Sequence, residues 1–122
     1  MSYITDKMTR QALVRMQEFF KKLKHLYDGE RIFLFDDQCR RNNLMSGPQE
    51  RFFADEIGKI YRDVVNNGKT GEPDIVVGQL NRELECKLTS PRANGCIQLQ
   101  TDYTTLCKKG SLDYLYVIAD KR

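Results

Sequence analysis

The sequence predicts a mixed α/β (α+β) fold, in which a small mixed central sheet is flanked by helices. Two segments carry apolar residues at helical spacing. Short runs rich in Val, Ile and Leu alternate with polar residues, which is typical of half-buried strands. A chain of 122 residues can bury one modest core. We therefore expect a single domain over residues 1–122, in which 1–45 are an N-terminal helix and strand extension and 46–122 are the core.

The first predicted element is an amphipathic helix over residues 5–27. Its apolar side chains recur at helical spacing: Leu13, Met16, Phe20, Leu23 and Tyr27. The basic side chains around them are expected to form a solvated face. Two alternatives stay open, a cationic helix lying along phosphates and a dimer seam. A strand candidate over 31–35 and a polar loop over 36–43 follow, and Arg40 and Arg41 in that loop are candidate contacts to nucleic acid.

A second helix is predicted over residues 48–66, with Pro48 in its first turn and the Asn67-Gly68 pair as its stop. Glu50 falls inside the apolar stripe of this helix, whereas Glu56 lies at the edge of the stripe and is expected to be solvated. A carboxylate that points inward suggests a partner such as a metal ion. A favourable helix-dipole position or a fraying helix end is the simpler alternative.

Two short strands, over residues 75–77 and 84–88, are expected to form a hairpin. Side chains alternate between the faces of a strand, so Glu85 and Lys87 project to one side and Cys86 to the other. If Gly78 pairs with Asn81, the register sets Asp74 across from Glu85 with Cβ atoms roughly 5 Å apart. A slip by one residue would turn Asp74 to the wrong face.

The chemistry of this arrangement favours a divalent cation. Two carboxylates that lie this close repel each other, and Mg²⁺, or Mn²⁺ as a substitute, relieves that repulsion while it keeps waters for reaction. Lys87, on the same face as Glu85, adds a positive charge that can orient an attacking water and stabilise charge on a phosphate. The alternative is a solvated hairpin with Asp, Glu and Lys on its outer face.

These motifs resemble the PD-(D/E)xK, or restriction-endonuclease-like, nuclease superfamily. The resemblance rests on Glu50 in a helix, Pro73-Asp74 at a strand start and Glu85-Cys86-Lys87 on the next strand, followed by a predicted helix over 95–109 and a predicted strand over 112–119. It covers about residues 46–119. It implies a restriction-endonuclease-like core and a Mg²⁺-dependent DNA endonuclease that leaves 5′-phosphate and 3′-hydroxyl ends.

The resemblance also implies a role for each residue of the motif. Asp74 and Glu85 would ligate the metal, with the backbone carbonyl of Cys86 as a further ligand. Lys87 would serve the attacking water. Glu50 would contact a metal through water or hold a second one. The Cys86 side chain faces away from the charged face and is expected to be a buried small hydrophobe.

The sequence departs from the family between the second helix and the Asp74 strand, where the family has a further strand. Either the helix ends early and residues 61–65 supply a short strand, or residues 31–35 fill the role from upstream. The family often has a Gln after the Lys, which Gln98 or Gln100 would match here as a contact to nucleic acid.

Two classes of function follow. The first is a metal-dependent DNA endonuclease, either of restriction type or structure-selective and resolvase-like. The small size of the chain favours a homodimer on a DNA duplex. It could also be the catalytic part of something longer, with a larger specificity domain or subunit. The alternative is a non-catalytic nucleic-acid-binding module or subunit that retains the nuclease fold.

The composition bears on the binding partners of the protein and on its cellular compartment. Twenty basic and 17 acidic residues give a mildly positive balance, which permits nucleic-acid binding. The four cysteines form no Cys-x-x-Cys pair and the sequence carries no signal peptide, so we expect reduced thiols in an intracellular, cytoplasmic protein that is bacterial, archaeal or phage-encoded. No stretch is long and apolar enough for a membrane span.

Overall fold

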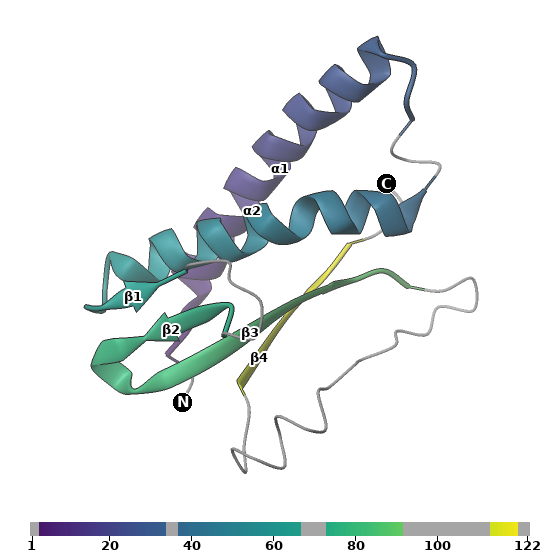
Figure 1. Ribbon diagram of the computed structural model, residues 1–122. Coiled ribbons are helices and arrows are strands. Elements are labelled where there is room, and N and C mark those ends of the chain that lie inside the picture. The colour runs from purple at the N-terminus through teal and green to yellow at the C-terminus, as the bar shows by residue number, and fades with distance from the viewer. Residues whose placement is uncertain (1–2, 34–36, 67–72, 92–112, 120–122) are drawn as a thin grey trace.

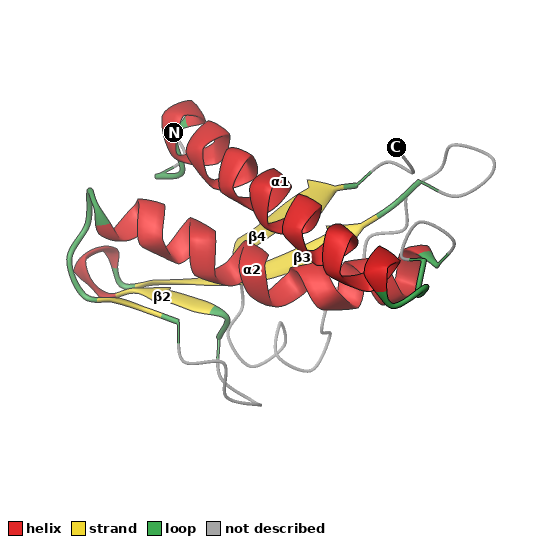
Figure 2. Ribbon diagram, turned by 90° about the horizontal axis from the view of Figure 1, so that it is seen from above, coloured by secondary structure: helices red, strands yellow, loops and turns green. Residues whose placement is uncertain are grey.

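The computed structural model describes residues 3–33, 37–66, 73–91 and 113–119. Within them lie two helices, α1 (Asp6–Gly29) and α2 (Gln38–Gly58), and a mixed four-stranded sheet. Its strands are β1 (Val64–Val65), β2 (Ile75–Val77), β3 (Arg82–Thr89) and β4 (Asp113–Ile118), and they lie in that order. β1, β2 and β3 pair antiparallel, whereas β4 runs parallel to β3. Both helices lie on the same side of the sheet (Figures 1 and 2). This bears out the mixed α+β class.

Helix α1 confirms the predicted N-terminal helix. Thr5 caps it, since its Oγ1 accepts a hydrogen bond from the Met8 backbone N–H at 3.2 Å. The helix buries Met8, Ala12 and Met16, which lie on one face against α2 and the sheet. The apolar spacing of the sequence therefore identified the packed face of this helix.

Helix α2 begins and ends earlier than predicted. Its N-cap is Asp37, whose carboxylate accepts from the Arg40 backbone N–H at 3.0 Å, and Pro48 lies inside the helix. An interior proline costs about 3 kcal/mol, but the turns before it bury Arg41 and Met45 and so hold the helix together. The predicted loop over 36–43 is therefore wrong from residue 38 onward. Residues 31–33 of the upstream strand candidate form no strand.

The early end of α2 releases the chain to form β1, so a short strand does lie within residues 61–65, as the first of the two alternatives proposed. The connection is tight. Asp63 adopts a left-handed backbone with φ of 59°, and its carbonyl accepts from the Gly78 N–H at 2.8 Å. A Cβ at Gly78 would lie 2.7 Å from the Asp63 Cβ, so only glycine fits this close approach.

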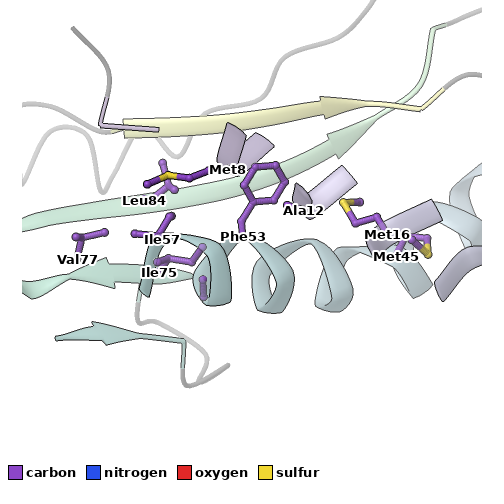
Figure 3. Close-up of a cluster of buried hydrophobic side chains, with 10 residues drawn as sticks. Met8, Ala12, Met16, Met45, Phe53, Ile57, Ile75, Val77 and Leu84 are labelled. Atoms are coloured by element: carbon purple, nitrogen blue, oxygen red, sulfur yellow. The ribbon is translucent and has the colours of Figure 1, made fainter. Parts of the chain in front are cut away.

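The core lies between α1, α2 and the strands β2 and β3 (Figure 3). Phe53 and Ile57 of α2 and Ile75 and Val77 of β2 are fully buried. Glu56 is also buried, at 4% exposure, and its carboxylate lies 2.8 Å from the Lys59 ammonium, so the expectation that it is solvated is wrong. The ion pair explains how a charge is accommodated there.

Of the remaining predicted elements, one strand is confirmed and one helix lies outside the residues that the structure describes. β4 confirms the strand predicted over 112–119. Between β2 and β3 the chain makes a 3₁₀ turn, η2 (Gly78–Leu80), and Asn81 closes it in the left-handed conformation. The helix predicted over 95–109 lies outside the described residues. Among the described helices, none has the length and apolar character needed to cross a membrane.

Candidate functional site

The hairpin register is the one that the sequence predicted. Ile75 pairs with Leu84, Val76 with Glu83 and Val77 with Arg82, and the same register carried one step further sets Asp74 opposite Glu85. The Asp74 carboxylate turns toward β3, where Oδ2 accepts a hydrogen bond from the Cys86 backbone N–H at 2.8 Å. This bond fixes one carboxylate oxygen at the start of β2, directly beside the Glu85-Cys86-Lys87 segment.

The two faces of β3 separate apolar from charged side chains. Leu84 is buried, and Cys86 and Leu88 pack against the core, which leaves Glu85 and Lys87 on the other face. Burial, followed by the nearby Asp74 carboxylate, raises the pKa of the Cys86 thiol well above its ordinary value. Cys86 therefore stays a neutral side chain that packs against the core as predicted, although it is partly rather than fully buried.

Glu50 reaches the same point from α2. Its pKa is raised to about 7, first by desolvation, then by the charge of Asp74 and by a side-chain hydrogen bond to Asp74. The charge of Glu85 adds to this effect, and a hydrogen bond from Asn66 opposes it. Glu50 of α2 thus lies within electrostatic reach of Asp74, directly before β2, and of Glu85 on β3. The inward placement of Glu50 in the helix was the signal for it in the sequence.

Two amide side chains hold these elements in register, and sequence reasoning missed both. Asn66, directly after β1, donates from Nδ2 to the Asp74 carbonyl at 2.8 Å and to Glu50 Oε1 at 3.5 Å. Gln49, fully buried in α2, donates to the carbonyls of Lys87 and Leu115 at 3.2 and 3.4 Å. The Val64-Val65 pair was the available signal for a strand that ends directly before Asn66.

A pair of tyrosines borders the charged face of β3. In the parallel pairing, Tyr114 lies beside Glu85 and Tyr116 beside Lys87. Their rings stack with centroids 5.7 Å apart. The alternate spacing of these tyrosines in the predicted last strand was a signal that sequence reasoning did not use.

The two arginines predicted to contact nucleic acid differ in their exposure. Arg40 is exposed in the first turn of α2. Arg41 is 4% exposed, and its guanidinium donates to Ser90 Oγ at 2.8 Å and to the Ala119 carbonyl at 3.4 Å. Arg41 thus has a structural role in tying α2 to the ends of β3 and β4. Gln98 and Gln100 lie outside the described residues.

The side chains at the site have the chemistry that Mg²⁺ prefers. Across the described part of the chain, no group of three or more His, Cys, Asp or Glu side chains is arranged so that it could hold a metal ion. Mg²⁺, however, is usually held by one or two carboxylates and keeps several waters. Asp74 and Glu50 supply hard oxygen donors, and the charges of Asp74 and Glu85 both raise the pKa of Glu50, a repulsion that a cation would relieve. The donor set therefore fits the group that the resemblance implies.

Comparisons of this chain with protein-family models, with curated proteins and with solved structures find no match.

Proposed function

We propose that this chain is a Mg²⁺-dependent endodeoxyribonuclease that hydrolyses phosphodiester bonds with a metal-activated water. The observation that carries the proposal is the set of contacts around Asp74: Asn66 bonds both the Asp74 carbonyl and Glu50 of α2, and the Asp74 carboxylate accepts from the Cys86 N–H between Glu85 and Lys87. A solvated hairpin alone would not bring an acid from α2 to the same point. The order of the motifs resembles that of the PD-(D/E)xK nucleases, and this resemblance also supports a metal-dependent nuclease.

In this proposal Asp74 and Glu85 hold the cation, with the Cys86 carbonyl as a further oxygen and Glu50 as a ligand through water or at a second position. The cation would supply Lewis-acid stabilisation of the phosphate and a water of lowered pKa. The Cys86 N–H holds Asp74 Oδ2 in place, which leaves the carboxylate little freedom to turn away from the site. Such preorganisation spares the carboxylate from reorienting during the reaction.

Lys87 orients the attacking water and stabilises the negative charge that develops on the phosphate. Its backbone is anchored, since Gln49 donates to its carbonyl, while its side chain stays partly exposed on the face that carries Glu85. In-line attack on phosphorus then breaks one P–O bond and leaves a 5′-phosphate and a 3′-hydroxyl.

The substrate is DNA, and we propose a homodimer because one compact chain carries one site and a duplex has two strands. The experiment that tests the function incubates the chain with Mg²⁺ or Mn²⁺ and linear duplex, four-way junction, flap and single-stranded DNA. We expect metal-dependent cleavage of at least one substrate, and loss of that cleavage in Asp74→Ala. Equal cleavage by folded Asp74→Ala would exclude this site. Binding without cleavage by the natural sequence would favour a non-catalytic nucleic-acid-binding module.

A further inference from the structure

The Asn66 side chain touches both elements that bring the acids together. Its Nδ2 donates to the Asp74 carbonyl at 2.8 Å, which lies on the β2 side, and to Glu50 Oε1 at 3.5 Å, which lies on the α2 side. The residue is half-buried and follows β1 directly. One amide group therefore bridges the helix and the strand segment that carry the candidate ligands.

The position of Asn66 is set by the pairing of β1 with β2. Val64 pairs with Val77 and Val65 with Val76, so the end of β1 lies beside the start of β2, where Asp74 is found. At the other end, the Gly78 N–H donates to the Asp63 carbonyl at 2.8 Å. The amide is thus presented by a strand that is fixed at both ends.

A neutral amide is well suited to this position. A Lys or Arg would also donate to Glu50 but would neutralise the acids and repel a divalent cation. The Asn66 amide holds a carboxylate oxygen by a hydrogen bond and adds no net charge. It leaves the negative potential of the three acids available to a cation.

We propose that Asn66 is a positioning residue, which holds the Glu50 carboxylate beside Asp74 and so sets the affinity of the site for a divalent cation. The inference rests on the proposed function, since it assigns Asn66 to the same site. It goes further by naming a residue that lies outside the motif and acts through Glu50.

Titration calorimetry with Mn²⁺ alone tests the proposal on the full chain and on Asn66→Ala. We expect Asn66→Ala to bind Mn²⁺ about tenfold more weakly, which is the size expected for one lost hydrogen bond to a charged group. Asn42→Ala is the matched control, because the Asn42 amide also donates to a side-chain oxygen, Ser90 Oγ at 3.0 Å, but at the Arg41 end of α2. This control should bind Mn²⁺ as the natural sequence does.

A second measurement separates positioning from general support of the fold. The ¹³C NMR signal of the Glu50 side-chain carboxyl, recorded at fixed pH without metal, should shift in Asn66→Ala and stay in place in Asn42→Ala. A weaker Mn²⁺ affinity with an unmoved Glu50 signal would overturn the proposal. If Asn66→Ala does not fold, the near-isosteric Asn66→Leu takes its place with the same expectation.

The two proposals fail in different ways. If the natural sequence binds Mn²⁺ and cleaves DNA, and Asn66→Ala does both equally well, only the role of Asn66 is lost. If the natural sequence neither binds Mn²⁺ nor cleaves any DNA substrate, the proposed function is lost and the role of Asn66 with it.

Discussion

The two halves of α2 carry polar networks of opposite character. Near its N-terminal end, the buried Arg41 guanidinium donates to neutral oxygens of Ser90 and Ala119, and the Asn42 amide joins it at Ser90. In its second half, Glu50 meets the like charges of Asp74 and Glu85. The Arg41 and Asn42 donors find neutral acceptors in the first half, while acids lie near one another in the second. The first network stabilises the fold, whereas the second places like charges near one another, which is the arrangement that the proposed cation site requires.

Arg41→Ala should have the largest effect on stability. The change deletes a buried side chain and its hydrogen bonds, so the free energy of unfolding should fall by about 3 kcal/mol. Urea denaturation of the natural sequence and of Arg41→Ala measures this difference in the free energy of unfolding. Arg51→Ala is the control, since Arg51 is exposed and pairs with Asp55 at 3.4 Å, and it should cost less than about 1 kcal/mol. Equal losses in the two variants would contradict the structural role assigned to the Arg41 end.

Gly78→Ala should have the next largest effect on stability. The new Cβ would lie 2.7 Å from the Asp63 Cβ and 2.9 Å from the Asp63 carbonyl oxygen. We expect a loss of about 2 kcal/mol in the free energy of unfolding. Gly29→Ala provides the contrast at the last residue of α1, where a Cβ meets nothing within 4 Å, and it should change stability by less than about 0.5 kcal/mol. Stability unchanged at Gly78 would show that β1 is not tightly joined to β2.

The contribution of Glu50 to stability should change with pH in the opposite sense to that of a carboxylate in a salt bridge. The folded pKa of Glu50, about 7, lies above its ordinary value of 4.5. The folded state therefore binds more protons between these values, and stability is lost as the pH rises through 7. Glu50→Gln should remove this loss, so without divalent cations the variant should be the more stable protein at pH 8. Chemical denaturation at pH 5 and pH 8 measures it, with the exposed Glu18→Gln as control. A natural sequence that gains stability over this range relative to Glu50→Gln would contradict the account.

Arg40→Ala should have the smallest effect, and only on DNA binding. Arg40 is exposed, so loss of one phosphate contact should leave stability unchanged and lower the slope of log affinity against log salt by about one. Arg40→Lys keeps the charge and should keep the slope. An unchanged slope in Arg40→Ala would remove Arg40 from the proposed DNA surface.

Local patterns in the sequence predicted the elements whose contacts are near in the chain. The apolar spacing of α1, the strand β4 and the register that sets Asp74 against Glu85 all follow from side-chain periodicity and a short turn. Such features depend on neighbours in sequence, so a single chain reveals them.

The bounds of α2 depended on contacts that the sequence does not display. Pro48 suggested a helix start, but burial of Arg41 against Ser90 and Ala119, distant in the chain, outweighed it. Asn66 was missed although one alternative placed a short strand over residues 61–65, because the bonds of its amide go to Asp74 and Glu50, which are distant in the chain. The missed residues are thus those placed by tertiary contacts rather than by local propensity.

The most direct test of the central claim is the initial rate of plasmid nicking as a function of Mg²⁺ concentration, compared between the natural sequence and Lys87→Ala. Lys87 is partly exposed, so the variant should keep its fold, which circular dichroism can check. The account predicts nicking by the natural sequence that saturates with Mg²⁺, and no nicking by Lys87→Ala at any concentration. Equal rates in the two proteins, or no nicking by the natural sequence, would contradict it.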